Sequence, residues 1–329
     1  MKPLLAIRDL STAFSLPGGL VARPVDGVSL DLFPGETLAL VGESGSGKTT
    51  LALSLLRLIP ELPGRIDPAG RVELDGTDIL QLDPAALRRV RGGGIAMVFQ
   101  EPGSSLNPVM TVGSQIAETV RVHARLDRRA ARQRARDLLA DVGLGDADRR
   151  LDQYPHELSG GMQQRVMIAM ALAGGPRVLI ADEPTTALDV TIQLQILDLL
   201  ADLKQRLGLA VLLITHDLGV AARVADRVAV MYAGRIVESA PSIRLFERPR
   251  HPYTEALLLS APRVDRTGEP LAVVPGQPPP ATDWPAGCRF HPRCPHAWER
   301  CRSTEPELLA DGEQVSRCWL MDEPVRRTP

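Results

Sequence analysis

The sequence has no long hydrophobic run and no excess of charge of either sign. No apolar run in its 329 residues reaches the roughly 18 that a membrane-spanning helix needs. The most apolar stretch, residues 166–181, is interrupted by Gly174, Gly175, Pro176 and Arg177. The formal net charge of -2 excludes a global field that would draw the chain to nucleic acid or anionic lipid. We therefore expect no membrane span, and partners that are recognised locally.

A secretion signal and an internal repeat are also missing. Residues 1–7 are followed at once by charged Arg8 and Asp9, so this end lacks the longer apolar core of a secretion signal. We expect the chain to stay in the reducing cytoplasm, where structural disulfides are rare. Cysteine is absent before Cys288, and all four cysteines fall between Cys288 and Cys318.

The hydrophobic content of 44% is enough for a full-sized core. Short strand-like segments fill residues 4–41, and the last of them is the apolar run 37–41. Similar runs recur at residues 95–99, 178–181 and 210–215, with helical patterns between them. Continuous apolar runs are typical of buried parallel strands, so the alternation predicts an α/β sheet.

Residues 110–150 lack strand signals and are rich in alanine, leucine and arginine, which predicts an inserted helical region. Its arginines are Arg121, Arg125, Arg128, Arg129, Arg132, Arg134 and Arg136. Acidic Asp127, Asp137 and Asp141 lie among them, which favours a solvated helix face over a nucleic-acid patch. After Ser260 the sequence turns proline-rich, which is typical of an extended linker.

A glycine-rich segment follows the run 37–41. It reads Gly42-Glu43-Ser44-Gly45-Ser46-Gly47-Lys48-Thr49, with Thr50 next, and matches the Walker A pattern of phosphate-binding loops. Glycines let backbone N–H groups turn towards phosphate oxygens, where a Cβ would obstruct the turn. Lys48 supplies a point charge to the β- and γ-phosphates, and the Thr49 hydroxyl can bind Mg²⁺. The remaining predicted ATP contacts of the loop are Gly42, Ser44, Gly45, Ser46, Gly47 and Thr50.

Two carboxylates end the apolar run 178–181. We assign Asp182 to the magnesium side, directly or through water, and Glu183 to polarising the attacking water. The alternative is that the pair only caps the following segment. The phosphate-binding loop elsewhere in the chain favours the catalytic interpretation.

The segment Leu158-Ser159-Gly160-Gly161-Met162-Gln163-Gln164-Arg165 resembles the signature motif of ABC ATPases. A serine and two glycines opening a helix can form a second anion site. The resemblance implies that Ser159, Gly160, Gly161 and Gln163 cover the γ-phosphate bound by an opposite subunit. Two such subunits would then enclose two nucleotides.

Further positions fit the same resemblance. Gln100 is similar to the Q-loop glutamine, which implies contact with magnesium and with a membrane subunit, and His216 to the switch histidine of the γ-phosphate. The segment 186–189 resembles the D-loop and places Asp189 near the nucleotide, although threonine stands where serine is commoner. Phe14 is a candidate to stack on adenine, with a place in the core as the alternative.

The resemblance extends past the ATPase motifs. The segment His251-Pro252-Tyr253-Thr254 and the cysteine-containing tail are similar to ATP-binding subunits of oligopeptide and dipeptide permeases. This implies a P-loop ABC ATPase domain at residues 1–260, with a helical subdomain at about 101–170. It also implies a linker and metal-binding extension at 261–329.

The implied role is ATP hydrolysis for a peptide importer at the cytoplasmic face of the inner membrane. The implied partners are a second ATPase subunit, a related chain or a copy of this one, two transmembrane permease subunits and, indirectly, an extracytoplasmic solute-binding protein. Nucleic acid is not among them. The alternatives are an importer of nickel or another small solute and a non-transport ABC ATPase.

The cysteines Cys288, Cys294, Cys301 and Cys318 follow the spacing C-x5-C-x6-C-x16-C. Four thiolates satisfy either an iron-sulfur cluster or tetrahedral zinc, and the spacing does not choose between them. The family resemblance favours a [4Fe-4S] cluster over Zn²⁺, with free or disulfide-linked thiols as a further alternative. The extension could also act as a redox or metal sensor.

Overall fold

The computed structural model describes residues 2–186, 188–260 and 274–324. The chain forms two compact units. Unit 1 comprises Met1–Leu5, Leu32–Glu36 and Leu74–Ile214, and unit 2 comprises Ala6–Asp31, Thr37–Glu73 and Thr215–Pro329. The predicted domain boundary at residue 260 stays a prediction, but the compact units do not divide there.

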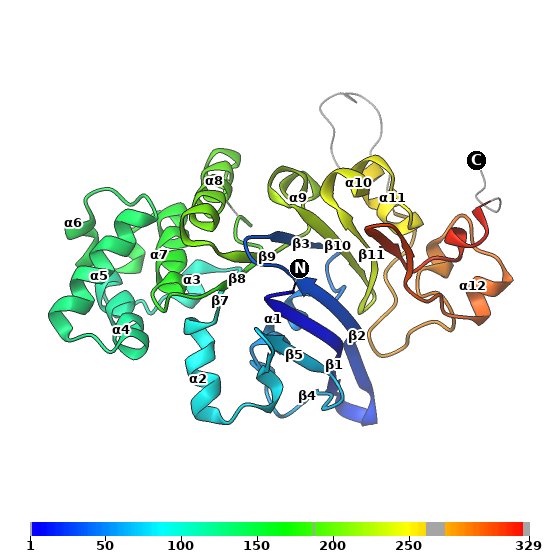
Figure 1. Ribbon diagram of the computed structural model, residues 1–329, viewed down its shortest axis with the longest axis horizontal. Helices are drawn as coiled ribbons and strands as arrows, with labels where there is room; N and C mark the ends of the chain where they lie inside the picture. Colours follow the sequence, from blue (N-terminus) through cyan, green and yellow to red (C-terminus); the bar gives the residue numbers. More distant parts are fainter. Residues whose placement is uncertain (1, 187, 261–273, 325–329) are drawn as a thin grey trace. The chain divides into compact units, whose positions relative to one another are not determined.

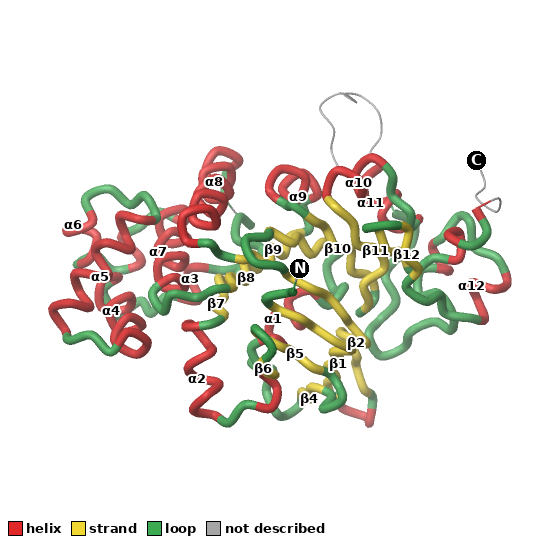
Figure 2. The backbone as a smooth tube through the Cα atoms, viewed as in Figure 1, coloured by secondary structure: helices red, strands yellow, loops and turns green. Residues whose placement is uncertain are grey.

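Unit 2 contains two groups of strands. In one, β2 and β5 flank β1, and β4 also pairs with β1; in the other the strand order is β12-β13-β11-β10-β3. The strands are β1 (Leu5–Ser15), β2 (Val21–Leu32), β3 (Thr37–Val41), β4 (Gly64–Ile66), β5 (Arg71–Leu74), β10 (Arg227–Tyr232), β11 (Arg235–Pro241), β12 (Leu309–Asp311) and β13 (Gln314–Ser316). The first two are long strands, where the sequence suggested several short ones. Figure 2 shows β10 and β11 side by side, and β12 joins the same sheet through β13.

The core of unit 2 lies around β3 and β10. All five residues of β3 are buried, and β3 pairs with β10 in parallel, from Leu38 opposite Arg227 to Val41 opposite Val230. The helices of this unit are α1 (Lys48–Leu55), α9 (Leu218–Val224), α10 (Ser242–Glu247), α11 (Pro252–Ser260) and α12 (Glu299–Ser303). The C-terminal tail, residues 274–324 of the described chain, contributes the hairpin β12–β13 to the sheet that contains β3.

Unit 1 combines parallel strands with helices. Its strands β7 (Ile95–Val98), β8 (Val178–Asp182) and β9 (Ala210–Thr215) run parallel in the order β7-β8-β9, and β6 (Thr77–Asp78) is a short strand. Its helices are α2 (Pro84–Gly93), α3 (Pro102–Ser105), α4 (Val112–Ala124), α5 (Arg128–Asp141), α6 (Ala147–Leu151), α7 (Gly160–Leu172) and α8 (Val190–Leu207). Figure 1 shows α4, α5 and α6 grouped together. No helix in the described part of the chain is both long and apolar enough for a membrane span.

The predicted helical region is present, and its arginines lie on exposed faces. The side chain of Asp127 accepts the Ala130 N–H at the start of α5, and Ala131 and Ala135 lie on the buried face of that helix. On the exposed side, Arg132 pairs with Asp152 and Arg136 with Asp148, at N···O distances of 2.9 and 2.7 Å. In the second pair, the hydrogen bond from Arg136 to Asp148 raises the pKa of the arginine.

Candidate ATP-hydrolysis site

The glycine-rich loop of unit 2 runs from the end of β3 to the start of α1. Gly47 has a φ of 107°, and a Cβ at this position would lie 1.9 Å from the backbone oxygen of Pro24. A Cβ on Gly42 would lie 2.2 Å from the Met231 oxygen. The backbone therefore turns so tightly against β2 and β10 that both positions require glycine.

Lys48 points back over this loop. Its Nζ donates to the backbone oxygens of Gly42, at 2.8 Å, and Glu43, at 3.0 Å, and contacts the Ser46 hydroxyl at 3.4 Å. Only 5% of Lys48 is exposed, whereas Ser44 and Thr49 are exposed. The ammonium group is thus held at the loop, as a lysine that neutralises phosphate requires.

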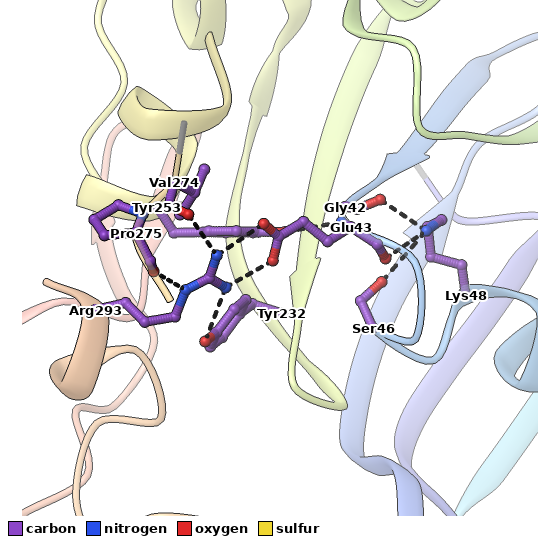
Figure 3. Close-up of polar contacts among 9 residues, drawn as sticks. All are labelled: Gly42, Glu43, Ser46, Lys48, Tyr232, Tyr253, Val274, Pro275 and Arg293. Atoms are coloured by element: carbon purple, nitrogen blue, oxygen red, sulfur yellow. Dashed lines mark hydrogen bonds and ion pairs between the residues drawn. The ribbon is translucent and has the colours of Figure 1, made fainter. Parts of the chain in front are cut away.

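Glu43 makes hydrogen bonds within unit 2 through its N–H, its carbonyl oxygen and its carboxylate (Figure 3). Its N–H donates to the hydroxyl of Tyr253 at 2.9 Å, and its carbonyl accepts from Lys48. Its carboxylate accepts two bonds from Arg293, from Nη1 to Oε2 at 2.7 Å and from Nη2 to Oε1 at 2.9 Å. These hydrogen bonds with Glu43 raise the pKa of the Arg293 guanidinium above its ordinary value.

Gln100 and the two predicted catalytic carboxylates lie in unit 1. Asp182 is the last residue of β8 and is 2% exposed. Glu183 follows in a left-handed backbone conformation, with a φ of 46°. Its Oε2 accepts from Nε2 of Gln100 at 3.1 Å and from the hydroxyl of Thr186 at 2.9 Å. A strained backbone at a hydrogen-bonded carboxylate is typical of functional sites, and these bonds fix the direction of the Glu183 side chain.

The predicted signature segment begins α7. Ser159 is the N-cap residue, is exposed, and makes no side-chain hydrogen bond to its own helix. Gly161 lies against α8, because a Cβ there would be 2.6 Å from Cγ2 of Ile192. Gln163 donates to the backbone oxygens of Pro155 at 2.8 Å and Leu158 at 3.3 Å, so its amide shapes the turn before the helix. Its predicted contact with ATP stays a prediction.

Three other predicted residues have defined surroundings. Asp189 caps α8 by accepting the Ile192 N–H at 3.0 Å. His216 is exposed and follows β9. Phe14 is half-buried on β1, opposite Gly64 of β4. None of these positions contradicts the predicted role, and none tests it.

The four cysteines are free thiols, two half-buried and two buried. The Cys288 N–H donates to the Cys301 oxygen at 2.8 Å. Burial, with smaller contributions from neighbouring thiols, raises the pKa of Cys288 and Cys318 to about 12 and that of Cys294 to about 11. Among the residues that the structure describes, no three histidine, cysteine or acidic side chains lie in positions to hold a metal ion. The four thiols are thus in one region but are not arranged as the predicted metal centre.

Comparison with known proteins gives the family. The sequence model described as "ABC transporter" matches residues 25–186, and the one described as "Oligopeptide/dipeptide transporter, C-terminal region" matches residues 237–301. A peptide import ATP-binding protein of Brucella abortus (strain 2308) is 50% identical over 316 residues, which cover 96% of this chain and 94% of that protein. This chain belongs to the ABC transporter family. A peptide import ATP-binding protein of Brucella ovis is 51% identical to this ABC protein, over 96% of this chain and 97% of its own length.

Solved structures agree with the family. A dimeric ATP-binding cassette in a post-hydrolysis state with ADP and Pi matches the ABC protein with a TM-score of 0.64 and 29% identity, over 72% of this chain and 98% of its own. A Clostridium perfringens cassette, described as part of an ABC transporter complex, matches with a TM-score of 0.64 and 27% identity, over 75% of this chain and 92% of its own. The predicted family and the α/β fold of a P-loop ABC ATPase are therefore confirmed.

Some contacts at the site were not predicted from the sequence of this ABC protein. Thr186 bonds to Glu183, and both Tyr253 and Arg293 bond to Glu43 of the phosphate-binding loop. Thr186 was identified in the sequence as part of the predicted D-loop, but its hydrogen bond to Glu183 was not predicted. Tyr253 and Arg293 are remote in sequence from the loop and carry no comparable signal.

Proposed function

We propose that this chain hydrolyses ATP to drive peptide import through membrane partners. The observation that carries the proposal is the 50% identity, over nearly the whole length of both chains, to proteins named as peptide import ATP-binding proteins. The match of residues 237–301 to the C-terminal region of oligopeptide/dipeptide transporters supports the same cargo.

We assign a chemical role to each part, and the hydrogen bonds of Lys48 and Glu183 support the roles of these two residues. The loop that contains Lys48 binds the ATP phosphates, Thr49 and Asp182 serve the magnesium ion, and Gln100 senses it. Glu183, held by Gln100 and Thr186, is the general base that activates water. His216 contacts the γ-phosphate, Phe14 stacks on adenine, and the helix start at Ser159 with Asp189 covers the nucleotide of a second ATPase subunit.

The assembly we propose places this chain at the cytoplasmic face of the inner membrane. It pairs with a second ATPase subunit, related or identical, and with two transmembrane permease subunits, and an extracytoplasmic solute-binding protein delivers the cargo. The test is reconstitution of the chain with its cognate permease subunits in vesicles. Di- or oligopeptides with the binding protein should stimulate ATP hydrolysis and accumulate inside; stimulation by nickel or another small solute instead would overturn the peptide assignment.

We also infer that the four cysteines bind a metal centre, a [4Fe-4S] cluster in preference to Zn²⁺. The gathering of four thiols supports this, because a buried thiolate is costly unless a cation compensates its charge. The side chains must move together to bind the metal, which would supply electrostatic compensation and cross-linking of the tail. Purification without oxygen, with measurement of iron, sulfide, zinc and visible absorbance, tests it. Stoichiometric zinc in a colourless sample overturns the cluster, and absence of both metals overturns the site.

A further inference from the structure

Arg293, in the C-terminal tail of unit 2, contacts the phosphate-binding loop at the side chain of Glu43. Glu43 lies within that loop, directly after Gly42, and its carboxylate is directed away from Lys48 and towards Arg293 (Figure 3). The two N···O distances of 2.7 and 2.9 Å make a bidentate ion pair across 250 residues of sequence. Bidentate arginine–carboxylate pairs fix geometry as well as charge, because both groups are planar.

Arg293 is itself held rigidly. Besides its two bonds to Glu43, it donates from Nε to the Pro275 oxygen at 2.7 Å, from Nη2 to the Val274 oxygen at 3.3 Å and from Nη1 to the Tyr232 hydroxyl at 3.4 Å. These five bonds match the five N–H donors of a guanidinium. Its side chain is 4% exposed. A buried arginine with all its donors occupied has little freedom to swing away from the carboxylate.

A cluster of aromatic side chains packs around the ion pair of Arg293 and Glu43. The rings of Tyr232, Tyr253 and Phe290 lie with centroids 4.5 to 5.4 Å apart, and all three side chains are buried. The guanidinium of Arg293 lies 5.7 Å from the Tyr232 ring and 5.9 Å from the Phe290 ring. Tyr253 also accepts the Glu43 N–H. The cluster therefore fixes both the backbone and the carboxylate of Glu43.

We propose that Arg293 is a positioning residue for ATP binding, which holds the phosphate-binding loop through Glu43 and makes nucleotide affinity depend on a docked tail. The proposal rests on the assignment of residues 42–49 as the ATP phosphate site. With Arg293 in place, the backbone at Glu43 is fixed before ATP arrives, so binding does not have to order the loop. Without Arg293, part of the free energy of ATP binding is used to order the phosphate-binding loop.

The test compares Arg293→Met with Arg317→Met in the full chain paired with its partner ATPase subunit. Arg317 is a matched control: it also directly precedes a tail cysteine and also donates to backbone oxygens, those of Ile236 and Pro306, but it does not touch the loop. We expect Arg293→Met to weaken Mg-ATP binding roughly ten-fold, with a raised KM and a smaller change in kcat. Hydrogen exchange of the peptide that spans residues 42–47 should become faster without nucleotide. Arg317→Met should leave both properties near those of the unmodified chain.

A double-mutant cycle separates positioning from general loss of structure. If Arg293 acts through Glu43, the pair Glu43→Gln and Arg293→Met will weaken ATP binding no more than Arg293→Met alone. Arg293→Lys keeps the charge but cannot form the planar pair in which two nitrogens each bond one oxygen. It should be intermediate, and it remains informative if the methionine variant does not fold. Unchanged ATP affinity in a folded Arg293 variant, equal loss in Arg317→Met, or additive effects in the cycle would each overturn the proposal.

Lys48→Ala distinguishes the two assignments. If this variant keeps its ATP affinity, the phosphate site itself is wrong, and the positioning role is wrong with it. If Lys48→Ala loses ATP while Arg293→Met retains it, the phosphate site stands and only the positioning role is overturned.

Discussion

Gln100 donates a hydrogen bond to Glu183, from Nε2 to Oε2 at 3.1 Å, and so joins the second residue after β7 to the residue directly after β8. The same oxygen accepts the Thr186 hydroxyl at 2.9 Å. Two donors on one carboxylate oxygen hold the carboxylate group of Glu183 in place. The arrangement gives the proposed general base a fixed orientation before ATP is bound.

Glu183→Gln should therefore keep ATP binding and lose turnover. A glutamine keeps the shape of the side chain but cannot take a proton from water, so kcat should fall roughly 100-fold or more. ATPase rates and equilibrium ATP binding, measured on the same paired subunits, check this. Glu118→Gln on the exposed face of α4 is the matched control and should behave like the unmodified chain. Full turnover in Glu183→Gln would refute the role of Glu183 as base.

The two glycines Gly47 and Gly45 should respond differently to alanine. Both have positive φ, 107° and 79°. A Cβ on Gly47 would collide with the Pro24 oxygen at 1.9 Å, whereas a Cβ on Gly45 would meet no atom within 4 Å beyond its chain neighbours. Gly45→Ala adds only left-handed backbone strain, about 1 kcal/mol. Gly47→Ala must also displace the loop or β2, so we expect a larger loss of unfolding free energy and loss of ATP binding. Denaturant unfolding and ATP titration measure the two effects, and equal behaviour of both variants would contradict the loop geometry.

The sequence predicted elements whose residues carry their own signal. The run 178–181 is apolar because β8 is buried on both faces, and the loop that contains Lys48 is marked by its glycines. The hairpin β12–β13 was not predicted, because these three-residue strands are partly polar and depend on pairing of β13 with β11, as between Ser316 and Glu238. The Arg293 contact with Glu43 was likewise missed, since no local pattern connects residues 250 positions apart.

Gly161→Ala should impair the packing of α7 against α8. The new Cβ would lie 2.6 Å from Cγ2 of Ile192, while a Cβ on neighbouring Gly160 would make an ordinary 3.7 Å contact with Leu188. Both glycines lie in the first turn of α7 and both changes are from glycine to alanine, so a difference between the variants reports mainly the steric effect. We expect a lower melting temperature for Gly161→Ala and no decrease for Gly160→Ala. A stabilised Gly161→Ala variant would mean that Ile192 moves aside at no cost.

Protonation of His251 should lower the free energy of unfolding in mild acid. It is 1% exposed, and burial lowers its pKa from 6.5 to about 3. Between these values the unfolded chain binds a proton that the folded chain does not, so this contribution to the unfolding free energy is complete above pH 6.5 and is lost as the pH falls towards 3. The expected slope is up to about 1.4 kcal/mol per pH unit.

His251→Asn isolates that slope. Nδ1 of His251 accepts the Tyr253 N–H at 3.0 Å, and the Oδ1 of an asparagine can accept it instead, but asparagine does not titrate. The smaller side chain lowers stability by an amount that does not depend on pH, so the measurement is the slope of unfolding free energy between pH 6.5 and 5. The slope should decrease in His251→Asn by about one proton's contribution. An unaltered slope in His251→Asn would show that other groups cause the acid sensitivity, because burial of a neutral imidazole cannot avoid this linkage.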